Sequence, residues 1–95
     1  MSLYVARIEL HSKLYAPDFI TLHRAMEQNG FEKSIRADDG RTYNLPRGEY
    51  VVTTDKGSQA VMSAAAGAVE ATGQTAEIFI TEVSSWISRG LTEKK

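Results

Sequence analysis

Three side chains suited to acid–base chemistry occupy alternate positions near the N-terminus: Arg7, Glu9 and His11. In a β-strand, every second side chain points to the same face, so these three would lie side by side. A Glu and a His on one face suit the base and acid of phosphodiester cleavage, and an Arg suits the phosphate. The same pattern is typical of a solvated strand face with a Glu–Arg pair, and the residues alone leave both interpretations open.

A second candidate is the stretch ADDGRTYNLPRGEY, residues 37–50, which holds the turn signals Asp39-Gly40 and Pro46-Arg47-Gly48. Arginine side chains suit phosphates, and a tyrosine can stack on an unpaired base, so we list Arg36, Arg41 and Tyr43 as RNA-binding candidates. The alternative is a long or bent hairpin in which Tyr43 and Leu45 cover the edge of the core. We expect Asp39-Gly40 to form the tight turn, with Gly40 supplying the positive φ.

Trp86 and Ile87 follow the last predicted strand and are candidates for an interface. A Trp in this position either anchors a partner or caps the core. Because a sheet has open edges, residues 84–87 could pair with the edge of a second copy, which makes a homodimer plausible.

A metal site is not indicated. The chain has no cysteine and only two histidines, His11 and His23, which fall on a predicted strand and a predicted helix. No carboxylate group has ligand spacing, and no phosphate-loop or nucleophile-elbow pattern occurs. We therefore predict neither a metal nor a cofactor.

The elements that must position these residues can be read from hydrophobic periodicity. Residues 3–11 alternate as a half-buried strand, and 17–29 have the spacing of an amphipathic helix that ends at Asn29-Gly30. Strands are predicted at 31–36, 49–54 and 76–83, and a second helix, capped by Ser58, at about 59–72. The order β-α-β-β-α-β predicts an α+β, ferredoxin-like sandwich: a four-stranded antiparallel sheet with both helices on one face. Arg7, Glu9 and His11 would then lie on the face without helices.

Length and composition fit one domain, residues 1–95, with a core over about 3–83 and a tail over 84–95 that frays at its end. The formal charge is −1, with seven basic and seven acidic side chains in residues 1–50. Proteins that hold duplex nucleic acid non-specifically usually carry a basic excess, so any RNA contact here should be local. No apolar run approaches the roughly 20 residues of a membrane span, and no signal peptide is visible, so we expect no membrane contact and a cytoplasmic protein.

Several segments resemble the GhoS family, the endoribonuclease antitoxins of type V toxin–antitoxin systems. They are YVARIEL, FITLHRAMEQNGF, IRADDGRTYNL and YVVTT, all within the first 55 residues. The resemblance implies a ferredoxin-like fold related to small CRISPR-associated endonucleases, and cleavage of the messenger RNA of a membrane-active toxin. The positions that we match to the family are Arg24 and the turn residues Ala37, Asp38 and Gly40.

One position departs from that resemblance. The CRISPR-associated relatives have a catalytic Asp at the end of the first strand, where this chain has Glu9 and His11. We therefore expect any cleavage to be metal-independent, with the 2′-hydroxyl attacking the phosphate, His11 and Glu9 moving protons, and Arg7, Arg36 and Arg41 holding phosphates. The alternative function is a non-catalytic ferredoxin-like dimer that binds a protein partner or a small ligand.

Overall fold

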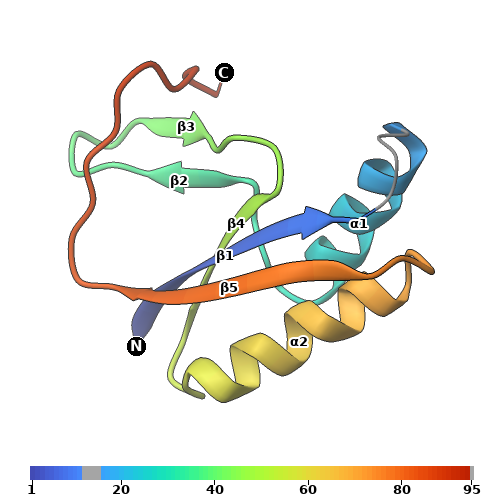
Figure 1. Ribbon diagram of the computed structural model, residues 1–95. Coiled ribbons are helices and arrows are strands. Elements are labelled where there is room, and N and C mark those ends of the chain that lie inside the picture. Colours follow the sequence, from blue (N-terminus) through green and yellow to red (C-terminus); the bar gives the residue numbers. More distant parts are fainter. Residues whose placement is uncertain (12–15, 95) are drawn as a thin grey trace.

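The computed structural model describes residues 1–11 and 16–94 of the chain, which form a small α+β structure (Figure 1). The two helices are α1 (Ala16–Gln28) and α2 (Ser58–Glu70). The strands are β1 (Ser2–Leu10), β2 (Ser34–Arg36), β3 (Thr42–Asn44), β4 (Glu49–Thr54) and β5 (Ala76–Val83). No helix in these ranges is long and apolar enough to cross a membrane.

The main sheet has three antiparallel strands in the order β4-β1-β5, so β1 is the central strand. The alternation predicted for β1 is confirmed, because Tyr4, Ala6, Ile8 and Leu10 are all buried whereas Arg7 and Glu9 are exposed. Period-two alternation sorts the strand into one face for the core and one face for solvent. The polar residues predicted to share a face therefore do so.

Both helices pack on the buried face of β1. The core joins β1 to Leu22, Ala25 and Met26 of α1 and to Val61, Ala65, Ala68 and Val69 of α2. The α2 contribution consists of small and β-branched side chains, which let this helix approach the strands closely. Helices and sheet thus form two layers, and the face of β1 that carries Arg7 has no helix over it (Figure 1).

The second predicted strand does not run along the main sheet. β2 pairs instead with β3 in a separate two-stranded sheet, which Figure 1 shows beyond β4. One antiparallel bridge connects this segment to the main sheet: Glu32 N–H donates to Val51 O (2.8 Å) and Val51 N–H donates to Glu32 O (2.9 Å). The predicted four strands are thus divided between a three-stranded and a two-stranded sheet.

Within the stretch 37–50, residues 37–44 complete a hairpin with β2 outside the main sheet, and residues 49–50 already belong to β4. The turn predicted at Asp39-Gly40 is confirmed, since Gly40 has a φ of +83° and its N–H donates to Ala37 O (3.0 Å). The strand β3 that follows was not predicted. Its three residues are too few for a periodic pattern, and they form a strand because β2 offers a partner.

The C-terminal tail lies along β3 rather than fraying. Asn44 N–H donates to Thr92 O and Lys94 N–H donates to Thr42 O, both at 2.8 Å. Figure 1 shows the tail leaving β5, passing the β2–β3 hairpin and turning back above β3. A local sequence pattern does not reveal such a pairing, because its partner lies about 50 positions earlier in the chain.

The helix ends agree only in part with the predictions. Asn29-Gly30 ends α1 as expected, because Gly30 has a φ of +87° and Phe31 N–H returns to Met26 O (3.0 Å). The predicted cap Ser58 is wrong: Gly57 is the N-cap of α2, Ser58 is already helical, and no side chain caps this end. Ser58 has the residue type of a cap, but the backbone turns into the helix one residue earlier.

Gly48 is the glycine on which the path into β4 depends. Its φ is +87°, its carbonyl accepts a hydrogen bond from Ile8 N–H (2.7 Å), and a Cβ at this position would lie 2.5 Å from Ile8 O. Gly40 has nearly the same φ, but nothing lies within 4 Å of its Cβ position. A side chain at Gly40 would therefore cause backbone strain alone, whereas a side chain at Gly48 would cause backbone strain and a steric overlap.

We expect Gly48→Ala to lower the free energy of unfolding by about 3 kcal/mol or more, because strain at positive φ adds to a collision with backbone that cannot move away cheaply. Gly40→Ala should cost only about 1–2 kcal/mol, which is the strain alone. Equilibrium urea unfolding of both variants measures the difference. Equal losses would contradict the close approach of Gly48 to β1.

Candidate functional site

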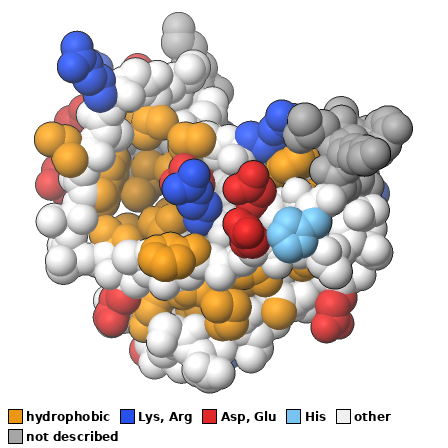
Figure 2. Space-filling model, in the orientation of Figure 1, with side chains coloured by type: hydrophobic (Ala, Val, Ile, Leu, Met, Phe, Trp, Pro, Cys, Tyr) orange, Lys and Arg blue, Asp and Glu red, His pale blue; other side chains and the backbone are white. Residues whose placement is uncertain are grey.

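The open face of the main sheet brings together residues from all three of its strands. The register places Arg7 opposite Glu49 of β4 on one side and Phe79 of β5 on the other, and Glu9 opposite Glu77. Figure 2 shows basic, acidic and histidine side chains grouped near the middle of one face, beside a hollow containing hydrophobic side chains. A shallow hollow of about 470 Å³ is lined by Arg7, Glu9, Glu77, Ile78 and Phe79.

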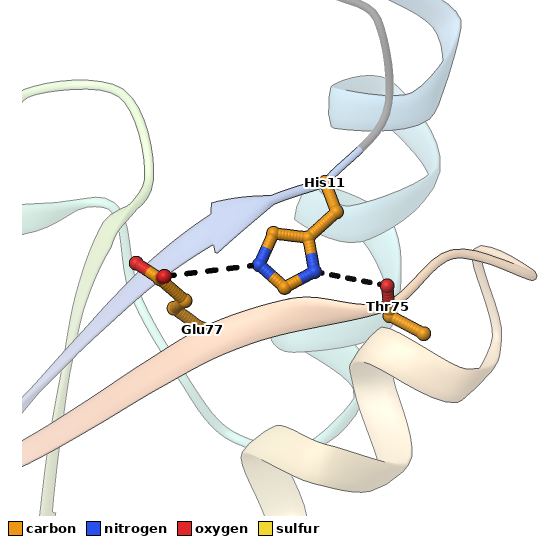
Figure 3. A network of polar contacts seen from close by, with 3 residues as sticks. All are labelled: His11, Thr75 and Glu77. Carbon is orange, nitrogen blue, oxygen red and sulfur yellow. Dashed lines mark hydrogen bonds and ion pairs between the residues drawn. The ribbon is translucent and has the colours of Figure 1, made fainter.

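His11 follows β1 directly and is held against β5. Its N–H donates to Thr75 O (2.9 Å), its Nδ1 lies 3.0 Å from Thr75 Oγ1, and its Nε2 lies 3.9 Å from Glu77 Oε2 (Figure 3). The ring is half exposed and the Glu77 carboxylate is more so. A carboxylate on this side favours an N–H at Nε2. The geometry therefore suits a proton donor.

The carboxylate nearest the ring was not the predicted one. Spacing along the strand predicted that Glu9 would be the acid beside His11, whereas the structure places Glu77 of β5 next to His11. Glu9 is exposed and lies across the strand pair from Glu77. Register with a distant strand, rather than spacing within one strand, decides which acid meets the histidine.

Phe79 is a candidate that sequence reasoning did not single out. It is 68% exposed and lies opposite Arg7 in the β1–β5 register. Alternation of β5 already placed Phe79 on the face away from Ile78 and Ile80, and a large aromatic on a polar face was the available signal. An exposed aromatic ring beside an arginine is the combination on which unpaired bases stack.

The remaining RNA-binding candidates lie on the hairpin, apart from the main sheet. Arg36 ends β2, Arg41 precedes β3, and Tyr43 lies within β3. Tyr43 is half-buried and its hydroxyl donates to Asp39 Oδ2 (3.4 Å). A hydrogen bond that Arg41 donates to Tyr43, followed by the charge of Glu93 and then those of Tyr43 and Asp39, raises the pKa of Arg41, so acidic groups already lie near this cation. The structure does not bring the hairpin arginines together with Arg7.

Trp86 and Ile87 lie on the tail and line an open groove. Ile87 is 96% exposed, whereas Trp86 is 37% exposed. Met1, Leu3 and Val83 also line this groove, which has a volume of about 910 Å³. Exposed apolar side chains beside a groove are typical of an interaction surface.

A second histidine forms a site that the sequence did not predict. His23 of α1 is half-buried, and its Nδ1 makes a short hydrogen bond with the hydroxyl of Tyr50 in β4. The two ring centroids lie 5.6 Å apart, and the ring centroid of Phe19 lies 6.2 Å from that of His23. Sequence reasoning considered His23 only as a metal ligand, and its contact with a strand 27 positions later was not visible locally.

Burial determines the protonation of this pair. Desolvation raises the pKa of Tyr50, so its hydroxyl keeps the proton, and Tyr50 has 0% exposure. Desolvation also lowers the pKa of His23, assisted by the positive charges of Lys33 and Arg47 and opposed by Glu27. A buried hydroxyl proton needs an acceptor, so we assign Tyr50 as the donor to Nδ1, which leaves the hydrogen of the neutral ring on Nε2.

The other residues considered for function are dispersed. Arg24 is exposed on α1, and Ala37-Asp38 and Gly40 lie in the β2–β3 turn, so the positions carried over from the family resemblance do not form one site. Within residues 1–11 and 16–94, no three His, Cys, Asp or Glu side chains lie close enough to share a metal ion.

Comparison with known proteins does not place the chain in a family. No family model, curated protein or solved structure matches it.

We expect stability to fall as pH falls through the range in which His23 titrates. Because the folded state holds the pKa of His23 below its ordinary value of 6.5, the unfolded chain binds more protons just below pH 6.5. The contribution of the neutral His23 ring to the free energy of unfolding is complete above pH 6.5. It is lost as pH drops through the lower, folded-state pKa of His23. Urea unfolding between pH 7.5 and pH 5 measures this slope.

His23→Gln should flatten that slope, whereas His11→Asn removes the other histidine and should retain it. An unchanged slope in His23→Gln would contradict the desolvated position of His23.

Proposed function

We propose that this protein binds single-stranded RNA across the open face of its main sheet. The observation that carries the proposal is the exposed Phe79 directly opposite Arg7. Among the described residues, the Arg7 side chain has neither a hydrogen bond nor an ion pair, so its guanidinium is available to a phosphate. A base stacked on Phe79 would bring its backbone phosphate within reach of a neighbouring cation.

We further infer a ferredoxin-like fold and a GhoS-like role, in the cytoplasm. The bridge between Glu32 and Val51 supports the fold, because it places residue 32 beside β4, where that sandwich has its second strand. The resemblance of YVARIEL and IRADDGRTYNL to the antitoxin endoribonucleases supports the role. The hairpin residues Arg36, Arg41 and Tyr43 would then extend the RNA path beyond the sheet.

Cleavage, where it occurs, would follow a metal-independent route. Glu9 takes the proton of the 2′-hydroxyl, the 2′-oxygen attacks phosphorus, and the bond to the 5′-oxygen breaks, leaving a 2′,3′-cyclic phosphate. The imidazolium form of His11 gives its Nε2 proton to the departing 5′-oxygen and is left as the neutral ring, with Glu77 beside that nitrogen. Arg7 balances charge on the phosphate oxygens.

A second candidate function, a homodimer or protein-binding module, is supported by the groove at Trp86 and Ile87. The exposed Ile87 costs hydration free energy that a partner would recover. This function needs no RNA and fits the near-neutral charge of −1. The two candidates use different parts of the protein and are separated by the RNA measurement below.

Fluorescence anisotropy with a labelled single-stranded oligoribonucleotide should give a binding curve that Phe79→Ala weakens by about fivefold to 100-fold, the effect of one lost stacking contact. Arg7→Gln should weaken binding by about fivefold or more and reduce its salt dependence.

The matched controls are Ile20→Ala, which trims an exposed apolar side chain on α1, and Lys56→Gln, which removes an exposed cation after β4. Both should bind as the native chain does. RNA affinity that is absent, or equal in all four variants, would contradict the proposal. If the chain also dimerises with concentration, that result favours the second candidate.

Cleavage of a single-stranded and structured RNA pool should persist in EDTA and fall by about 100-fold or more in His11→Ala, the usual contribution of a general acid. The product should end in a cyclic phosphate, which end-group analysis of the fragments detects. Cutting that EDTA abolishes, or that His11→Ala leaves intact, would contradict this mechanism without affecting the binding measurement.

A further inference from the structure

A small pocket lies between α1 and the turn that leads into β4, and Glu49 is the residue that it shares with the open face of the main sheet. Its volume is about 320 Å³, and its lining includes His23, Lys33, Asn44, Arg47 and Glu49. The proposed RNA site uses none of these residues, so the pocket is a separate candidate site.

Three donors of different kinds line this pocket. The Tyr50 hydroxyl donates to Nδ1 of His23, so the ring nitrogen left with a hydrogen is Nε2. Lys33 contributes an ammonium group and Arg47 a guanidinium group. Neither cation forms an ion pair within residues 1–11 and 16–94.

Arg47 is held in place without using its hydrogen-bond donors. Its Cζ lies 4.6 Å from the centroid of the Phe19 ring, so the guanidinium lies over the aromatic face. This cation–π contact uses none of the N–H donors of the guanidinium. A guanidinium that is held in place with its donors available suits an oxyanion, because less conformational entropy is lost on binding.

The lining of the pocket carries more positive than negative charge. Lys33 and Arg47 face one carboxylate in the lining, that of Glu49. After desolvation, the two cations help to lower the pKa of His23 and Glu27 opposes them, so all three charges lie close enough to act on its ring. A negative ligand would pair with the two cations, whereas a cation or an apolar ligand would not.

We propose that this pocket binds a phosphate group, held by the Arg47 guanidinium, the Lys33 ammonium and the Nε2–H of His23. A phosphate offers several acceptor oxygens, which matches donors arriving from α1, from residue 33 and from the turn before β4. The ligand is either inorganic phosphate or the phosphate of a small monoester. A carboxylate has fewer oxygens and less charge, and is the competitor to exclude.

The test is an NMR titration of the two histidine rings with sodium phosphate at pH 7.5, with sodium chloride keeping ionic strength constant. The His23 Cε1–H signal should shift along a saturable curve. His11, on the open face, serves as the reference within the same spectrum, and His11→Asn assigns the two signals. Signals of both rings that drift together without saturation would overturn the proposal.

Variants locate the site. Lys33→Gln and Arg47→Gln should each weaken phosphate binding by about fivefold or more, the loss expected for one charge-assisted contact, and the double variant should not saturate. Both side chains are exposed, so circular dichroism should show the native fold. Lys56→Gln is the matched control and should bind phosphate normally. Unchanged affinity in Lys33→Gln and Arg47→Gln would overturn the assignment.

Two further ligands, glycerol phosphate and acetate, test whether the site binds free phosphate, a phosphate monoester or a carboxylate. Glycerol phosphate that binds as well as inorganic phosphate identifies a site open to monoesters, and weaker binding identifies a site for the free ion; either result supports a phosphate site. Sodium acetate should shift the His23 signal little at the same concentration. Acetate that binds as tightly as phosphate would overturn the choice of a phosphate group.

Discussion

The structure depends on the pairing of β1 with two antiparallel neighbours at once. β4 and β5 fix the register of this one strand from both sides. A slip of one residue would turn Arg7 and Glu9 into the core and expose Tyr4 and Ile8. Burying unpaired charges costs far more than a sheet hydrogen bond contributes, so a single register is selected. The same register creates both the hydrophobic core and the polar open face.

Ala6 shows how closely the layers meet at the centre of that strand. It is fully buried and lies opposite both Tyr50 and Ile80. A small residue here leaves space for the Tyr50 ring, whose hydroxyl then reaches His23 on α1. The buried hydroxyl needs a partner, and the half-buried histidine supplies it. Packing in the sheet thereby determines which ring nitrogen of His23 carries its hydrogen.

Local patterns predicted the long elements well and the pairings between distant segments poorly. β4 (Glu49–Thr54) and β5 (Ala76–Val83) were predicted with their observed bounds, because each has strong β propensity and clear turn signals. The strand predicted at 31–36 shortened to Ser34–Arg36 and found its partner in β3 instead of in the main sheet. Strand pairing is a tertiary property, and a short mixed segment carries little information about its partner.

The candidate sites show the same difference between local patterns and distant pairings. Arg7, Glu9 and His11 lie together because spacing along one strand places them there, and spacing is visible in a sequence. Phe79, Glu77 and the Tyr50–His23 pair depend on register or on packing between layers. Their residue types were visible, but their neighbours were not. For Tyr43, the residue type allowed either a stacking ring or a cover for the edge of the core, and the structure shows a half-buried ring with its hydroxyl bonded to Asp39.

The open face contains one arrangement that a design for stability alone would avoid. Glu9 and Glu77 lie directly opposite each other on adjacent strands, and like charges in that position destabilise a sheet by up to about 1 kcal/mol. The His11 ring, 3.9 Å from the Glu77 carboxylate, offsets part of this repulsion when it carries a hydrogen on Nε2. Two acids and a histidine therefore lie within one small area. Sites that break a local rule of stability are where function is expected, because selection for chemistry tolerates a cost that selection for folding does not.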